Sequence, residues 1–266
     1  MTDRFGRIID QLRISVTDRC NLRCRYCMPA SGVKLLRNTD ILSFEEILDV
    51  ARAAVGMGIT KIRLTGGEPL VRRGVVHLVE KLASIDGLVD LAMTTNGTLL
   101  AEHARSVADA GLQRVNISLD TTDPHLYRQM TRCGDIRAVL AGIRAAQAAR
   151  LHPIKLNCVV GGLLAGSDAL SVKEFGRTNG LQVRIIRMMH FERGVFSVVE
   201  GGRGGDCRRC NRLRLSSDGS IRPCLFSDVF LSVRRLGPSK SIRLAVAKKP
   251  QAGGPCAHQW MYRIGG

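Results

Sequence analysis

Aromatic residues are scarce in this 266-residue chain, at 4% of positions with one tryptophan. Proteins that bind nucleic acid through stacked bases need aromatic platforms or a basic helix, so this scarcity disfavours that class. The longest uncharged stretch near the middle, Leu156–Ser167, is too short and too glycine-rich to span a bilayer. Residues 1–7 carry charge where a secretory signal needs an apolar run. We therefore expect a cytoplasmic protein without membrane contact.

Acidic residues are also few, at 23 against 40 lysines and arginines, and the net charge is +17. Such a charge attracts polyanions, namely nucleotides, nucleic acid or acidic proteins, but it also describes an arginine-rich surface with no specific partner. The nine cysteines are an odd number, and six of them fall in two compact groups. This distribution argues against a disulfide framework and favours metal binding.

Short β-like runs alternate with helical patterns through the first two thirds of the chain. The expected strands are Leu12–Val16, Lys61–Thr65, Val89–Thr94, Arg114–Leu119, Ile154–Val160 and Val183–Met188. The expected helices are Ser43–Met57, Arg73–Ala83, Leu99–Ala110, Ile136–Ala149 and Ala169–Arg177, the first of which begins with the capping-box spacing of Ser43 and Glu46. Six such units in succession indicate a parallel sheet, either open or closing into a partial barrel.

The expected strands have one apolar face and one polar face. In the first strand, Leu12 and Ile14 share one face and Arg13 lies on the other. A parallel sheet buried on both sides would be apolar on both, so the polar face favours a barrel interior. The ligand of such a barrel binds at the C-terminal ends of its strands, and a polar interior suits a polar or anionic ligand.

The first cysteine group, Cys20, Cys24 and Cys27, has CxxxCxxC spacing directly after the first expected strand. Its loop therefore lies at the barrel mouth. Three thiolates can hold a 4Fe–4S cube and leave one iron open for a small ligand. Zinc usually takes two CxxC pairs or added histidines, and no histidine lies near this loop in the sequence. We therefore predict an iron–sulfur cluster.

The second cysteine group is Cys207, Cys210 and Cys224. Two expected strands, Arg212–Ser216 and Ser220–Leu225, form a hairpin that can bring these thiols together. By spacing alone, an iron–sulfur cluster and a zinc site are supported about equally. The zinc site would be completed by His190, His258 or Cys256. We expect the basic tail from residue 232 to be irregular.

The first cysteine loop, with Tyr26 before its third cysteine and Gly66-Gly67-Glu68-Pro69 after the next strand, resembles the radical S-adenosylmethionine (SAM) superfamily. The resemblance narrows to the GTP 3′,8-cyclase family, which acts in molybdenum cofactor biosynthesis. The segments that carry it are 13–21, 61–69, 94–97, 116–120, 155–157, 210–219 and the terminal Gly265-Gly266. It runs almost continuously from residue 4 to about 190 and resumes from 207 to 226.

The resemblance implies a partial (β/α)6 TIM-like barrel over residues 1–190, with two 4Fe–4S clusters at its opposite ends. Residues 191–266 then form a shortened C-terminal segment that carries the second cluster. In this family an electron from the first cluster splits SAM, and the 5′-deoxyadenosyl radical takes the 3′ hydrogen of GTP. The ribose carbon then attacks C8 of guanine, which gives (8S)-3′,8-cyclo-7,8-dihydroguanosine 5′-triphosphate.

Site residues follow from the resemblance by position. The six cysteines of the two groups are the expected cluster ligands. The expected SAM contacts are Tyr26, Gly67, Ser118 and Met189. The expected GTP contacts are Arg13, Arg63, Thr94, Lys155, Arg212 and Arg214, and Gly265 and Gly266 are expected to reach the active site. The expected partners are an electron donor such as flavodoxin or ferredoxin, the next enzyme of the pathway and a second copy of the chain.

The sequence departs from that family in three places. The stretch between Met189 and Cys207 is shorter, the tail after Cys224 is shorter, and Arg187 stands where the family usually has an acid. Two alternatives therefore stay open: another two-cluster radical SAM enzyme, such as one that modifies peptides, or a degenerate inactive paralogue of the cyclase.

Overall fold

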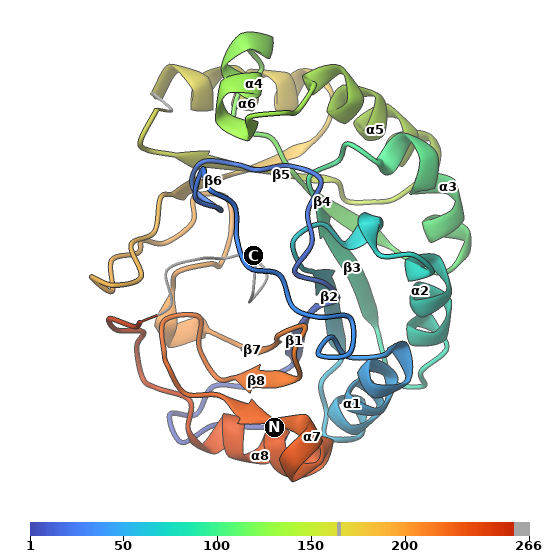
Figure 1. The fold of residues 1–266 in the computed structure, drawn as a ribbon, viewed down its shortest axis with the longest axis vertical. Coiled ribbons are helices and arrows are strands. Elements are labelled where there is room, and N and C mark those ends of the chain that lie inside the picture. The colour runs from blue at the N-terminus through green and yellow to red at the C-terminus, as the bar shows by residue number, and fades with distance from the viewer. Residues whose placement is uncertain (164–165, 258–266) are drawn as a thin grey trace.

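The computed structural model describes residues 1–163 and 166–257. Its strands are β1 Gln11–Ser15, β2 Lys61–Thr65, β3 Asp90–Thr95, β4 Arg114–Ser118, β5 Lys155–Val160, β6 Gln182–Arg187, β7 Arg212–Leu215, β8 Ser220–Arg222 and β9 Leu231–Ser232. They form one sheet in the order β6-β5-β4-β3-β2-β1-β7-β8-β9. The pairings from β6 to β7 are parallel, and β8 and β9 are antiparallel additions. The sheet curves without closing, so the predicted partial barrel is confirmed (Figure 1).

Eight helices accompany the sheet in the described part of the chain. They are α1 Phe44–Gly56, α2 Val75–Ala83, α3 Leu100–Asp109, α4 Pro124–Thr131, α5 Ile136–Ala148, α6 Gly166–Thr178, α7 Val233–Leu236 and α8 Pro238–Ala247. Figure 1 shows α1, α2, α3 and α5 along the outside of the curved sheet. The predicted capping box opens α1, because Ser43 Oγ accepts from the Glu46 N–H at 3.2 Å and Glu46 accepts from the Ser43 N–H at 2.7 Å. None of the described helices is long and apolar enough to cross a membrane.

The hydrophobic core lies between the outer face of the sheet and these helices. Leu12, Ile14, Ile62 and Leu64 are at most 1% exposed. Burial of each such side chain contributes about 1.5–3 kcal/mol relative to exposure. The alternating strand residues face the interior and are polar, as the sequence predicts. Because the apolar face packs on the helices, the polar face is directed to the concave side of the barrel.

The expectation of an irregular tail from residue 232 is wrong. Helices α7 and α8 occupy this region, and α8 packs against α1. Pro238 starts α8, and Ile242, Ala245 and Val246 are buried at helical spacing. Arg243 lies within this short apolar stripe, and Lys240 and Lys248 flank it, so the pattern is not evident in the sequence. The second hairpin strand is also shorter than predicted, because β8 ends at Arg222.

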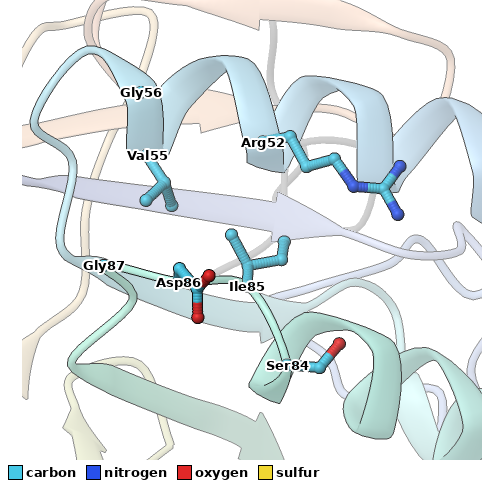
Figure 2. Close-up of a pocket in the computed structure, with 7 residues that line it drawn as sticks. All are labelled: Arg52, Val55, Gly56, Ser84, Ile85, Asp86 and Gly87. Atoms are coloured by element: carbon cyan, nitrogen blue, oxygen red, sulfur yellow. The ribbon is translucent and has the colours of Figure 1, made fainter.

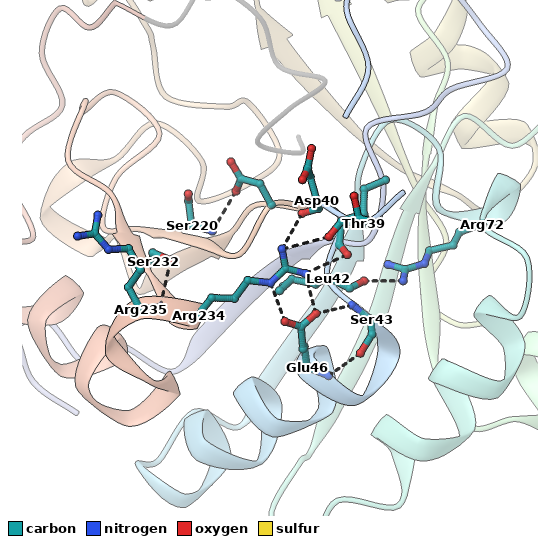
Figure 3. Close-up of polar contacts among 12 residues, drawn as sticks. Thr39, Asp40, Leu42, Ser43, Glu46, Arg72, Ser220, Ser232, Arg234 and Arg235 are labelled. Atoms are coloured by element: carbon teal, nitrogen blue, oxygen red, sulfur yellow. Dashed lines mark hydrogen bonds and ion pairs between the residues drawn. The ribbon is translucent and has the colours of Figure 1, made fainter. Parts of the chain in front are cut away.

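Arg234 of α7 ties the C-terminal segment to the barrel (Figure 3). Its guanidinium donates to both Glu46 carboxylate oxygens, at 2.7 and 2.9 Å, and to the main-chain carbonyls of Thr39, Asp40 and Ile41. The same carboxylate closes the α1 capping box, so one glutamate joins two parts of the chain. Strands β7–β9 continue the barrel sheet, and the division of the chain at residue 190 stays a prediction.

Candidate active site between two cysteine groups

Three arginines lie side by side on the inner face of the sheet. Arg13 on β1 is in register with Arg63 on β2 and with Arg214 on β7. Neighbouring strands lie about 4.8 Å apart, so three like charges are held close together. Arg63 and Arg214 are each only 6% exposed. We call these three residues the arginine row; all three are expected GTP contacts, and the structure brings them together.

The surroundings of the arginine row disfavour its positive charge. Burial, with the charges of neighbouring arginines, lowers the pKa of Arg63 to about 9 and of Arg214 to about 10, and it lowers that of Arg13 strongly. The buried Nε atoms of Arg13 and Arg63 have no hydrogen-bond partner among the described residues. Phosphate oxygens would supply acceptors in the geometry that guanidinium groups bind best. The row therefore favours a polyanionic ligand.

The remaining expected GTP contacts lie on the same face. Thr94 is in register with Asn116, which is in register with Lys155 on the next strand. Burial and the arginines around it lower the pKa of Lys155. Arg212 starts β7, and its Nη2 donates to the Arg203 carbonyl at 3.0 Å. Positive charge therefore extends across the concave side from β7 to β5.

The first cysteine loop follows β1 at the C-terminal ends of the strands. Cys20, Cys24 and Cys27 are half-buried there. Cys20 Sγ accepts from the Leu22 N–H at 3.4 Å and from Asn96 Nδ2 at 3.8 Å. Hydrogen bonds to sulfur are one of the means by which proteins tune a bound cluster. Three thiols in one loop with such donors fit a 4Fe–4S cube that has one open iron.

The turn after β2 holds this loop in place. The Glu68 N–H donates to the Arg19 carbonyl at 2.8 Å. A Cβ at Gly67 would overlap that same carbonyl, so only glycine allows the close approach. The buried Glu68 carboxylate accepts from Thr95 Oγ1 at 2.8 Å and from the Asn96 N–H at 2.6 Å. The turn thus joins the ends of β1, β2 and β3 around the predicted SAM site, with Gly67 in contact with the cysteine loop.

The other expected SAM contacts separate into two places. Tyr26 Oη donates to Asp120 Oδ2 at 2.7 Å, and Asp120 Oδ1 accepts from the Val159 N–H at 2.9 Å. Burial raises the pKa of Asp120 to about 6. Ser118 ends β4, two residues before Asp120, so it lies at the same edge. Met189 instead packs against a small apolar cluster near the second cysteine group.

The first three thiols need deprotonation before they can bind iron. Burial raises the pKa of Cys20 to about 11 and of Cys27 to about 12. The charge of a coordinating metal removes such protons outright. In the described ranges, no three His, Cys, Asp or Glu side chains converge on a point suited to a single ion. A 4Fe–4S cube does not need that convergence, because each thiolate binds a different iron.

The second cysteine group lies at the opposite end of the strands from the first, with the arginine row between them along the strand direction. Cys207 and Cys210 precede β7 and Cys224 follows β8, and all three are half-buried. The antiparallel β7–β8 pairing places Cys210 and Cys224 at the same end of the hairpin. Burial raises the pKa of Cys210, but the charges of Lys249 and Arg212 outweigh it, so the net pKa is lowered. Like the first group, these thiols can hold an anionic iron–sulfur cluster, here because positive charges lie beside them.

Two inner-face arginines were missed by the sequence analysis. Arg184 on β6 and Arg222 on β8 each have a buried Nε without a partner among the described residues. The alternation within Val183–Met188 is the signal that identifies Arg184. Arg222 lies on a strand of three residues, which is too short for a pattern. Arg187 ends β6 with an exposed side chain.

Some expected residues cannot be placed. Gly265, Gly266 and His258 lie outside the described residues. Cys256, which the zinc alternative invokes, is buried in the apolar cluster with Phe191 and Phe226, and its Sγ contacts the Phe191 carbonyl oxygen at 3.7 Å.

A surface hollow of about 460 Å³ lies at the opposite end of the sheet from the first cysteine loop (Figure 2). It is lined by Arg52, Val55 and Gly56 of α1 and by residues 84–87, which precede β3. These residues lie near the N-terminal ends of β2 and β3, and none of them is a cysteine or an inner-face arginine. The hollow is therefore separate from the candidate site.

Comparison with known proteins agrees with this geometry. The model of the "Radical SAM superfamily" matches residues 14–166. Two solved structures share the fold. Streptococcus suis SuiB bound to S-adenosylmethionine has a TM-score of 0.67 at 13% identity, over 92% of this chain and 65% of that one. Native anSMEcpe with bound AdoMet and a Kp18Cys peptide has a TM-score of 0.62 at 14% identity, over 91% and 81%.

Curated relatives are closer in sequence. The GTP 3′,8-cyclase of Moorella thermoacetica is 44% identical over 286 residues, which cover 91% of this chain and 88% of that protein. The GTP 3′,8-cyclase of Geobacter sulfurreducens is 38% identical over 327 residues, which cover 100% and 99%. The second alignment is longer than this chain, so that relative has residues without a counterpart here. The chain belongs to the GTP 3′,8-cyclase family of the radical SAM superfamily.

Proposed function

We propose that this protein converts GTP to (8S)-3′,8-cyclo-7,8-dihydroguanosine 5′-triphosphate in molybdenum cofactor biosynthesis. The observation that carries the proposal is the arginine row, which lies between two groups of three cysteines. A triphosphate offers several anionic oxygens to adjacent guanidinium groups. A substrate without such charge would leave the buried Nε atoms of Arg13 and Arg63 without acceptors. This requirement favours GTP over the peptide substrate of the alternative hypothesis.

We assign the inner-face residues to phosphate binding and to SAM binding. Arg13, Arg63 and Arg214 bind the phosphates, and Lys155 and Thr94 extend this contact toward β5. Such binding fixes the ribose between the phosphate site and the cysteine loop, so that the reacting carbon lies near bound SAM. Tyr26, Gly67 and Ser118 lie at the edge where SAM is expected.

Cofactor binding completes the proposal. Cys20, Cys24 and Cys27 would hold a 4Fe–4S cluster, which would supply the electron for SAM cleavage. Cys207, Cys210 and Cys224 would hold a second 4Fe–4S cluster, which would offer a binding site for the guanine.

Partners and location follow from the same proposal. We expect the reaction to take place in the cytoplasm, where cysteines stay reduced. The reductant is a flavodoxin or ferredoxin, and a positively charged protein favours an acidic donor. The product passes to the next enzyme of the pathway. A homodimer is expected from the family.

The deciding experiment is anaerobic reconstitution with iron and sulfide, followed by SAM and a strong reductant with and without GTP. We expect 5′-deoxyadenosine formation to depend on GTP and to accompany a cyclised guanine nucleotide. SAM cleavage that ignores GTP, with no cyclised product, would contradict the substrate assignment. The Cys224→Ala variant should keep the first 4Fe–4S cluster, because its first cysteine loop is intact, but it should form no cyclised nucleotide.

A further inference from the structure

We propose that Lys249 is the positioning residue of the second cysteine group, a role that rests on the proposed second cluster. Lys249 follows α8 and is 1% exposed. Its ammonium donates to the Arg212 carbonyl at 2.7 Å and to the Pro223 carbonyl at 2.6 Å. Arg212 is two residues after Cys210, and Pro223 directly precedes Cys224. One buried side chain therefore links the two strand ends that carry these cysteines.

The third cysteine is linked to the same point by Arg7. Its Nη1 donates to the Cys207 carbonyl at 2.8 Å and to the Gln251 carbonyl at 3.0 Å, and its Nη2 donates to the Pro250 carbonyl at 2.7 Å. Pro250 and Gln251 directly follow Lys249. The segment that places the Lys249 ammonium is thus held by the side chain that holds Cys207, and all three cysteine positions depend on one connected set of contacts.

A role toward the cysteine group explains why a lysine lies here. A buried ammonium is costly, and main-chain carbonyls alone compensate it only in part. Lys249 also interacts directly with the Cys210 thiol. Three donors can serve two carbonyls and one sulfur at once. An apolar side chain of similar length would fill the space but would remove the donor to both carbonyls and the positive charge beside the sulfur.

The test compares Lys249→Met with Lys248→Met, which changes the exposed neighbouring lysine. Both variants and the unmodified chain are reconstituted anaerobically, and iron, acid-labile sulfide and the EPR spectra of the reduced clusters are measured. We expect the iron content of the Lys249→Met protein to be about four irons per chain, against about eight in the unmodified chain, because one of two four-iron cubes is lost. The EPR signal of the first cluster should be retained in Lys249→Met, since that cluster is distant from the substitution. Lys248→Met should keep both clusters.

Each outcome decides a separate point. Full iron content in Lys249→Met would overturn the role of Lys249. Loss of both clusters would also overturn it, because the lysine would then support the whole fold rather than this group. An unmodified chain that binds only about four irons would instead contradict the proposed second cluster itself.

Discussion

Replacing Arg63 by methionine should strengthen the fold while it weakens substrate binding. Methionine keeps the length and flexibility of the apolar part of the side chain. The substitution removes a 6% exposed guanidinium that lies between Arg13 and the charges on β4 and β6. Stability and function should therefore change in opposite directions, as is common where a site is organised for a ligand rather than for the fold.

The pKa of Arg63 gives the scale of the stability change. Burial and the neighbouring arginines lower this pKa from 12.5 to about 9. At 1.36 kcal/mol per pH unit, this difference corresponds to roughly 5 kcal/mol against the charged folded form. A base with a lowered folded-state pKa carries this penalty in full at every pH below about 9, which includes neutral pH. Because local relaxation absorbs much of such a penalty, we expect a gain of about 1–3 kcal/mol in the free energy of unfolding.

The loss in binding follows from the hydrogen bonds to phosphate. Hydrogen bonds to charged groups contribute about 1.5–3 kcal/mol, and 1.4 kcal/mol is tenfold in affinity, so the Kd for GTP should rise about 10- to 100-fold. Denaturant unfolding of the cluster-free protein measures the first effect, and equilibrium GTP binding to the reconstituted protein measures the second. Arg144→Met, on the exposed side of α5, is the control and should change neither. A destabilised Arg63→Met protein, or one with unchanged GTP affinity, would refute this explanation of the arginine row.

Two further substitutions test the scaffold. Arg234→Met removes the hydrogen bonds to Glu46 and to three main-chain carbonyls. In a urea titration, this variant should show a free energy of unfolding that is lower by about 1–2 kcal/mol. The control, the adjacent Arg235→Met, should change the free energy of unfolding by less than about 0.5 kcal/mol. Burial raises the pKa of Glu68 from 4.5 to about 7, so the folded state holds the proton longer and stability should fall as the pH rises through that interval. Glu68→Gln should flatten this pH dependence, and equal slopes in the two proteins would show that the carboxyl does not titrate as described.

The barrel could be predicted from sequence because its strands alternate strictly. In Leu12–Val16 and Lys61–Thr65 every second residue is apolar, so each strand identifies its own buried face. The helices α7 and α8 could not be predicted in the same way, since the apolar stripe of α8 is short and lies among basic residues. Their stability depends on packing against α1, which no local pattern encodes.

The candidate site could be predicted where its residues follow a sequence pattern or the family resemblance. Arg13 and Arg63 were assigned by position from the family resemblance, and strand alternation places them on the inner face as well. The cysteines were found by their spacing. Lys249 and Arg7 could not be found, because their partners are main-chain carbonyls, which every residue has and no sequence pattern marks. Buried side chains that bind backbone become visible only once the chain is folded.

The pairing of β7 with β1 explains how a shortened chain can keep two cysteine groups in place. The first group follows the C-terminal end of β1, and the second group precedes β7, which runs parallel beside it. At about 3.3 Å per residue, the first and last residues of the five-residue strand β1 lie about 13 Å apart. This separation is fixed by main-chain hydrogen bonds between the strands. The stretch between Met189 and Cys207, shorter here than is usual in the family, is not part of the β1–β7 ladder, so it can lose residues without changing that register. Arg13 lies in the middle of that span, in register with Arg214, so one pair of strands carries two members of the arginine row between the first cysteine group and the Cys207–Cys210 pair.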